Sequence, residues 1–352
     1  MTIRRAAGLL LAALGALALP AQAGAGEMQH TLASFEDLPG WAADDHATAL
    51  ATFRASCDRV RDNDYATRED FAPLCAAAEQ QTDPRAFFET FFRPVLIEDG
   101  DRMVFTGYYE PEILASRNRV GKFQYPIYRR PPEFTPGTVW KTRAQIEGGA
   151  LAGRGLELAW LPDPVEAFFL HVQGSGRLKL NEGGVMRVGF DSKNGHPYRS
   201  IGKEMLRRGL LGRKGASAGR IKAWVRKNPV AGRVLLHHNP SFVFFRELKG
   251  LDPEAGPPGA MQVSVTAGRT LAVDPRYTPL GAPVYIDQTG DRPMQRLMVA
   301  QDVGSAIKGA QRADIFFGSG AEAGRIAGRT KAAGRMWTLL PLSAVRRLFP
   351  EG

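Results

Sequence analysis

The sequence predicts a mainly β protein whose short strands form a closed barrel or a sandwich, with a few helices packed against them. Short runs of β-branched, aromatic and aliphatic residues recur from residue 102 onwards, and Gly, Pro or Asn turns separate them roughly every eight to twelve residues. Helical spacing of apolar residues is concentrated between residues 41 and 92. We find no internal repeat, low-complexity tract or heptad pattern that would indicate another architecture.

The first 23 residues are expected to be a signal peptide and not part of the fold. Arg4 and Arg5 precede an apolar run over 6–19, and Ala-Gln-Ala at 21–23 has the small-x-small form of a cleavage site. The apolar run is too short and wrongly flanked for a membrane span. The mature protein is therefore expected to begin near Gly24 and to be periplasmic. Because no cysteine follows the apolar run, no lipid anchor on an N-terminal cysteine is expected.

Three short helices and a disulfide are predicted in the N-terminal region. Phe53 and Cys57 continue an apolar spacing of three and four, a second helix begins at residue 71, and Asp83-Pro84 supplies a cap and a proline before a third. Cys57 and Cys75 are the only cysteines. In an exported chain such a pair favours a disulfide that stabilises the fold by about 3 kcal/mol. The alternative is two buried free thiols.

The remaining elements follow from turns and apolar runs. A β-type run over 102–111 opens the middle of the chain, and helices are predicted only over 201–208 and 218–227 within it. The other predicted strands are 124–128, 167–173, 177–180, 185–190, 243–246, 261–266, 270–273, 283–286, 296–300 and 314–317.

The net charge is +10 at pH 7, and loss of the two signal-peptide arginines leaves +8. This excess favours an acidic polymer as partner: nucleic acid, anionic lipid, or a cell wall bearing peptide carboxylates. No block of lysine and arginine and no nucleic-acid-reading motif is present, so no nucleic acid partner is expected. An exported protein encounters the cell wall more readily than nucleic acid, so the cell wall is the expected partner.

Two aspartates, Asp302 and Asp314, each lie beside an apolar run and a glycine. Carboxylates beside strand ends are often catalytic residues in β-barrel enzymes. The alternative is that both aspartates accept backbone N–H bonds in tight turns, as Asp often does. The six histidines lack metal-ligand spacing, and there is no nucleophile elbow, dinucleotide fingerprint or phosphate loop. No metal and no cofactor is therefore expected. Carboxylates on a β scaffold suit cleavage of a glycosidic bond, with Tyr108, Tyr109 and Trp160 as candidates for stacking on sugars or for the core.

Several motifs resemble the membrane-bound lytic murein transglycosylase A (MltA) family. The segments over 105–111, 169–177, 194–202 and 238–246 are similar to signature segments of that family. The terminal block with Asp274, Asp302 and Asp314 resembles its 3D domain, named for three aspartates. The resemblance runs in order from about residue 105 to about residue 340.

The resemblance implies a fold with two domains and a groove between them. A double-psi β-barrel main domain would consist of 24–108 and 246–352, and a smaller β-barrel domain would be inserted over 109–245. Residues 1–23 would be the signal peptide. The protein would act as a monomer on the glycan strands of peptidoglycan.

The resemblance also implies the reaction. Members of this family are peptidoglycan lytic exotransglycosylases, which are lyases that cleave the β-1,4 bond between N-acetylmuramic acid and N-acetylglucosamine without water. The 6-hydroxyl of the muramic residue attacks its own anomeric carbon and gives a 1,6-anhydro end. One carboxyl serves as acid and then as base, whereas an inverting hydrolase needs a second carboxylate to activate water.

Roles for individual residues follow from their places in these motifs. Asp314 would be the acid/base, Asp302 would hold Asp314 or the sugar, and Asp274 would support a turn. Lys308 would bind substrate carboxylates or the developing oxyanion, with a solvated lysine as the alternative. The residues expected to line the groove are Thr106, Tyr108, Glu110, Gln173, Gly174 and Ser175, although Glu110 has the alternative of pairing with an arginine.

Two other functions stay open on the sequence. One is an inverting glycan hydrolase, since double-psi barrels also host enzymes that use two aspartates. The other is a peptidoglycan-binding protein without catalysis.

Overall fold

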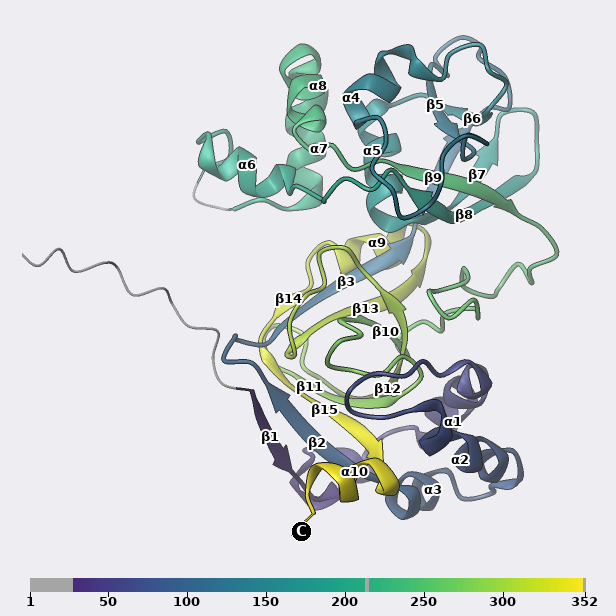
Figure 1. The fold of residues 1–352 in the computed structure, drawn as a ribbon. Coiled ribbons are helices and arrows are strands. Elements are labelled where there is room, and N and C mark those ends of the chain that lie inside the picture. The colour runs from purple at the N-terminus through teal and green to yellow at the C-terminus, as the bar shows by residue number, and fades with distance from the viewer. Residues whose placement is uncertain (1–27, 213–214, 351–352) are drawn as a thin grey trace, which may run out of the picture.

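The computed structural model describes residues 28–212 and 215–350. The predicted signal peptide lies outside these residues. The chain forms two β-rich halves, with a large sheet in the lower half of Figure 1 and two smaller sheets with several helices in the upper half. Both ends of the described chain belong to the lower half (Figure 1).

The large sheet has nine strands in the order β1-β2-β15-β11-β12-β10-β13-β3-β14. The chain therefore builds this sheet from both of its ends and makes the upper half in between. The strands are β1 (Gln29–Leu32), β2 (Phe92–Glu98), β3 (Val104–Glu110), β10 (Thr270–Val273), β11 (Pro283–Gln288), β12 (Met294–Val303), β13 (Arg312–Ser319), β14 (Lys331–Ala332) and β15 (Gly334–Pro341).

Four helices pack against one part of this sheet. A hydrophobic core joins β2, β11, β12 and β15 to α1 (His46–Arg54), α2 (Arg68–Gln80), α3 (Pro84–Phe91) and α10 (Leu342–Leu348). The side chains of Asp45, Thr67 and Asp83 cap α1, α2 and α3. The three predicted N-terminal helices are thus confirmed. Short helical turns η1 (Phe35–Asp37), η2 (Trp41–Ala43) and η3 (Cys57–Arg59) connect these elements, and α9 (Gly320–Ala327) packs on β3 and β13.

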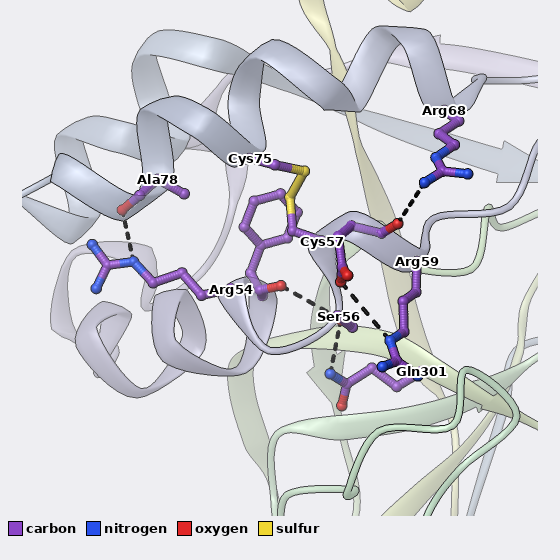
Figure 2. Close-up of a disulfide and its surroundings, with 10 residues drawn as sticks. Arg54, Ser56, Cys57, Arg59, Arg68, Cys75, Ala78 and Gln301 are labelled. Atoms are coloured by element: carbon purple, nitrogen blue, oxygen red, sulfur yellow. Dashed lines mark hydrogen bonds and ion pairs between the residues drawn. A yellow bond between two sulfur atoms is a disulfide. The ribbon is translucent and has the colours of Figure 1, made fainter.

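The predicted disulfide is present and joins η3 to α2 (Figure 2). Ser56, next to Cys57, accepts a hydrogen bond of 2.9 Å from Nε2 of Gln301. The same nitrogen donates to the carbonyl of Thr52, also at 2.9 Å. Because Gln301 lies fully buried on β12 beside Asp302, the helical layer fixes the strand that presents that aspartate.

The upper half contains a four-stranded sheet of order β4-β7-β8-β9 and the hairpin β5-β6. Its strands are β4 (Glu112–Ala115), β5 (Tyr125–Tyr128), β6 (Glu157–Leu161), β7 (Ser175–Leu180), β8 (Val185–Lys193) and β9 (Val243–Leu248). Its helices are α4 (Arg143–Gln145), the π-helix η4 (Ile146–Ala150), α5 (Pro164–Gln173), α6 (Ile201–Arg207), α7 (Ala218–Lys227) and α8 (Pro229–His237).

Most predicted strands are confirmed, but the fold is mixed α/β and not mainly β. The strand predicted over 167–173 is wrong, because these residues belong to α5. Asp163 caps this helix and Gly174 ends it with φ of +81°. Phe168 packs in the core shared with α7 and α8, whereas Leu170 packs in the sheet core. A helix that is buried on two sides is apolar on both, and its period is hidden.

Two further predictions are wrong for local reasons. Pro229 begins α8, which the sequence did not predict, because a proline fits the first turn of a helix. Residues 261–266 form a loop and not a strand; one isolated bridge joins Pro258 to Ser264. A Cβ at Gly259 would lie 2.8 Å from the carbonyl oxygen of Gln301, so the loop packs its backbone directly against β12.

None of the described helices combines the length and the apolar character that crossing a bilayer requires.

Candidate active site

Four side chains form a row across one face of the nine-stranded sheet. Ala272 on β10 pairs with Asp302 on β12 and with Asp314 on β13, and Asp314 pairs with Thr106 on β3. Paired residues on neighbouring strands point to the same face, and strands are about 4.8 Å apart. The two aspartates therefore stand about 10 Å apart at their Cα atoms. Along this row only the small side chain of Ala272 stands between them.

Asp314 has one carboxyl oxygen held and one free. The hydroxyl of Thr106 donates to Oδ1 at 2.5 Å, and Nη2 of Arg312 donates to that hydroxyl oxygen at 2.8 Å. None of the described residues donates a hydrogen bond to Oδ2. Burial raises the pKa of Asp314, and the bond from Thr106 and the charge of Arg312 oppose that rise. The half-buried carboxyl is thus fixed in place and biased towards the protonated form.

Asp302 has both carboxyl oxygens engaged. Its Oδ1 accepts the backbone N–H groups of Val303 at 2.9 Å and Ala260 at 3.0 Å, and its Oδ2 accepts the hydroxyl of Tyr108 at 2.9 Å. Burial raises the pKa of Asp302 to about 6 against the opposing effect of these bonds. Burial first, and then the charge of Asp302, holds the pKa of Tyr108 well above its usual range. The phenol therefore stays a donor to Asp302.

A cavity of about 520 Å³ lies between the two halves of the molecule and reaches both aspartates. Tyr108, Asp302 and Asp314 line it from the nine-stranded sheet, and Gln173, Gly174 and Ser175 line it from the end of α5 and the start of β7. The side-chain oxygen of Gln173 accepts the backbone N–H of Tyr109 at 3.1 Å. This bond fixes the upper wall of the cavity to β3.

Two predicted groove residues lie elsewhere. Glu110 is fully buried and accepts bonds from Arg177 at 2.8 Å, from Arg187 at 3.0 Å and from the hydroxyl of Ser319 at 2.8 Å. It pairs with arginines and does not line the cavity, so its predicted contact with substrate is wrong. It ties the end of β3 to β7 and β8. Thr106 contacts Asp314 and is likewise absent from the lining of the cavity.

Asp274 and Lys308 lie outside the cavity. Asp274 is buried and accepts bonds from Nη2 of Arg276 at 2.6 Å and from the backbone N–H of Gly309 at 3.1 Å. These contacts connect the end of β10 to the loop that precedes β13. Against the effect of burial, the hydrogen bonds from Arg276 and Gly309 lower the pKa of Asp274, and the charge of the exposed Lys308 adds to them. The geometry therefore gives no support to a contact between Lys308 and a ligand in the cavity.

The two other aromatic candidates also lie away from the aspartates. The ring of Tyr109 packs on α9, where a Cβ at Gly324 would meet it at 2.6 Å. Trp160 lines a separate cavity of about 740 Å³ in the upper half, with the guanidinium of Arg119 at 5.4 Å from its ring.

Sequence reasoning missed Arg143 and His171 on the upper wall. Arg143 is fully buried and donates to the carbonyl oxygens of Ser241 at 2.7 Å and Asn239 at 3.2 Å. Its Nη2 also lies 3.3 Å from Nδ1 of His171, which lines the cavity. Burial and the charge of Arg143 hold the pKa of His171 well below its usual value, so the ring is neutral. Its place between Phe169 and Gln173 in the motif was the available signal.

Arg312 was missed as well, although it lies only two residues before Asp314. Its guanidinium donates to the backbone carbonyls of Val104 at 3.0 Å and Ala313 at 2.6 Å as well as to Thr106. Burial lowers the pKa of Arg312, and the nearby Asp314 opposes that change. The arginine fixes the hydroxyl that in turn fixes the acid.

A carboxyl with a raised pKa at a cleft between two β-rich halves is typical of enzymes that cleave glycans by general acid–base catalysis. Residues 104–246 match the MltA specific insert domain, and residues 269–340 match the 3D domain. The chain is 41% identical over 253 residues to membrane-bound lytic murein transglycosylase A of Escherichia coli K12, which covers 70% of this chain and 67% of the relative.

Solved structures agree with this relationship. The membrane-bound lytic murein transglycosylase of Agrobacterium tumefaciens superposes with a TM-score of 0.81 at 35% identity, over 90% of this chain and 99% of the other. E. coli MltA with bound chitohexaose superposes with a TM-score of 0.71 at 32% identity, over 90% and 96% of the two chains. The chain belongs to the membrane-bound lytic murein transglycosylase A family.

Proposed function

We propose that this protein is a lytic transglycosylase that cleaves the β-1,4 bond between N-acetylmuramic acid and N-acetylglucosamine in peptidoglycan and leaves 1,6-anhydro ends. The observation that carries the proposal is the carboxyl of Asp314, whose Oδ1 is held by Thr106 and whose Oδ2 is free at the cavity. A glycan ligand fits the family, since the E. coli relative was solved with bound chitohexaose.

The reaction needs one carboxyl used twice. Protonated Asp314 gives its proton to the glycosidic oxygen, and N-acetylglucosamine leaves with a free 4-hydroxyl. The resulting carboxylate takes the proton of the muramic 6-hydroxyl as its oxygen bonds to the anomeric carbon. Asp314 thereby returns to its protonated state. The nucleophile belongs to the same sugar, so proximity replaces the activated water that a hydrolase requires.

The surroundings of Asp314 suit both steps. Burial favours the protonated acid before cleavage. The hydrogen bond from Thr106 and the nearby Arg312 stabilise the carboxylate that exists between the two proton transfers. Asp302, positioned by Tyr108 and two backbone N–H groups, would orient the chain beside the acid. Asp274 would only support the turn.

An inverting hydrolase is the second candidate, because Asp302 lies in the same row as Asp314. Asp302 would then be the base that activates water. That role suits it poorly, since both of its oxygens already accept hydrogen bonds. A wall-binding protein without catalysis would have no use for a carboxyl with a raised pKa and a free oxygen.

The finer architecture and location are also proposals. The nine-stranded sheet would be a double-psi β-barrel made of 24–108 and 246–352, with the insert over 109–245. Action from chain ends and a periplasmic location would follow the family resemblance and the N-terminal apolar run.

Mass spectrometry of digested sacculi tests the reaction and the residue together. The protein is expected to release anhydromuropeptides, and the Asp314→Asn variant to release none. Products one water heavier, with reducing ends, would refute the proposal and identify a hydrolase. If the parent binds sacculi but releases no product, the hypothesis of a wall-binding protein without catalysis remains.

A further inference from the structure

A third cavity, of about 390 Å³ and also in the upper half, is lined mainly by basic side chains. We name its five basic residues the basic cluster: Arg117, Arg129, Arg130, Arg246 and Lys249. All five are exposed: three arginines follow β4 and β5 along the chain, Arg246 lies on β9, and Lys249 follows β9. Segments far apart in the sequence thus bring their cations to one place.

The charge in this cavity is not neutralised internally. Its two acidic residues each meet one arginine: Asp191 accepts from Nε of Arg130 at 2.9 Å, and Glu247 lies 3.5 Å from Nη2 of Arg117. Five cations against two anions leave three positive charges. No acidic side chain of the described residues pairs with Arg129 or Lys249. The cavity therefore suits a ligand with negative charge.

The basic cluster and the cavity that holds Asp314 meet at β9, the edge strand of the four-stranded sheet. Arg246 lines both cavities. Its Nη2 donates at 2.7 Å to the side-chain oxygen of Gln262, which also lines the Asp314 cavity. Neighbouring residues of β9 line the two cavities from opposite faces of the strand, with Leu248 in the Asp314 cavity and Glu247 in the cavity of the basic cluster. A group attached to a strand at Asp314 therefore reaches the basic cluster by passing around this edge strand at Arg246.

Peptidoglycan has the matching chemistry. Each N-acetylmuramic acid bears a short peptide on its lactyl group, and that peptide has free carboxylates. A stem of four residues reaches about 13 Å when extended. Guanidinium groups bind carboxylates in bidentate geometry, and four of the five basic residues are arginines.

A membrane surface fits this cavity less well. The apolar residues of its floor are buried: Leu158 is 8% exposed, Met186 2% and Phe245 1%. Sites that bind the membrane interface combine basic residues with exposed apolar or aromatic side chains that insert among the lipids. No exposed apolar or aromatic side chain of the described residues lines this cavity.

We propose that the basic cluster is a subsite for the carboxylates of the stem peptide on the glycan strand bound at Asp314. The inference rests on the proposed function, which brings that strand into the cleft. It assigns a peptide-recognition role to the upper half of the molecule, beside its role as a wall of the glycan cleft.

The test uses a double variant, Arg129→Gln with Lys249→Gln, and two substrates: peptide-bearing glycan strands and strands stripped of peptide by an amidase. Both changes are remote from Asp314. The KM for peptide-bearing strands is expected to rise about fivefold, the product of two modest exposed contacts, and the rise is expected to disappear at about 0.5 M salt. The kcat, and the KM for stripped strands, are expected to stay unchanged.

The matched control removes two charges elsewhere in the upper half, by Lys203→Gln with Lys227→Gln. Both lysines are exposed and line neither cavity. This control is expected to match the parent on both substrates. Equal KM values for parent and double variant on peptide-bearing strands would overturn the inference, as would an equal rise on stripped strands. Phosphatidylglycerol vesicles that bind the parent but not the double variant, with KM unchanged, would assign the surface to a membrane.

Failure of the proposed function would be visible separately, because the parent would then cleave neither substrate. Cosedimentation with intact and amidase-treated sacculi would still decide the inference. Retention of the parent that is lost both by stripping the peptides and by the double variant supports the subsite. Retention that is equal in all cases refutes it.

Discussion

Replacing Asp302 by asparagine is expected to stabilise the protein at neutral pH while impairing its activity. The pKa of Asp302 rises from an ordinary 3.8 to about 6 in the folded chain. A shift of about two units corresponds to about 3 kcal/mol. Asparagine resembles the protonated acid in shape and charge, so it avoids the cost of burying a carboxylate.

The sign follows from the protons bound in each state. Folded Asp302 keeps its proton up to about pH 6, whereas the unfolded chain releases it near 3.8. The free energy of unfolding of the parent, relative to the variant, should therefore fall between about pH 4 and pH 6 and then stay level. The variant should equal the parent near pH 3.5 and exceed it by about 3 kcal/mol at pH 7.

Urea unfolding followed by tryptophan fluorescence at several pH values measures this difference. Asp291→Asn, which removes an exposed carboxylate from the turn between β11 and β12, controls for the loss of one charge. A difference between Asp302→Asn and parent that does not change with pH would refute the reasoning. Activity of Asp302→Asn is expected to fall about 10- to 100-fold, because a hydrogen-bonded charged acceptor beside Tyr108 is lost.

Three further changes test other parts of the structure. Thr106→Val removes a hydrogen bond that lowers the pKa of Asp314. The basic limb of the pH profile of kcat should therefore move to higher pH by about one to two units. Glu110→Ala leaves the buried Arg187 and the partly buried Arg177 without their acid and should cost about 3–5 kcal/mol of stability in urea unfolding. Cys57→Ser opens the bond to Cys75, which spans 18 residues, and should cost about 3 kcal/mol in the same assay.

Each of these changes has a control. Thr106→Ser keeps the hydroxyl and should leave the profile in place, and a valine variant with an unmoved or lowered basic limb would contradict the role given to Thr106. A loss below about 0.5 kcal/mol for Glu110→Ala would mean that its ion pairs are solvated. Reductant should destabilise the parent as much as Cys57→Ser does and leave that variant unaffected; any other pattern argues against the disulfide as the cause.

The sequence predicted the features of the fold that depend on residues close together in the chain. Caps and prolines indicated the N-terminal helices, turns delimited most strands, and the motif over 169–177 indicated a segment at the cleft. Resemblance to a family supplied what periodicity does not contain, namely how two distant parts of the chain form one sheet. It also assigned roles to Asp302 and Asp314, which the structure brings into one row.

What the sequence missed depends on distant partners. The arginines on Glu110 lie 67 and 77 residues further along the chain, so nothing local distinguished an ion-paired acid from a substrate ligand. Arg143 is polar, and no sequence pattern predicts that the guanidinium of the first residue of α4 is fully buried. The helix α5 is apolar on two sides because two cores enclose it, and its period was therefore hidden.

The order of the strands has a consequence for when the protein becomes active. Thr106 meets Asp314 across 208 residues of chain, and Tyr108 meets Asp302 across 194. In the nine-stranded sheet β3 lies between β13 and β14, so a chain synthesised only as far as the end of the insert holds β3 without either neighbour. Contacts at such separation form late in folding. A protein that cuts the wall thus gains its cutting site only when nearly all of its chain is in place.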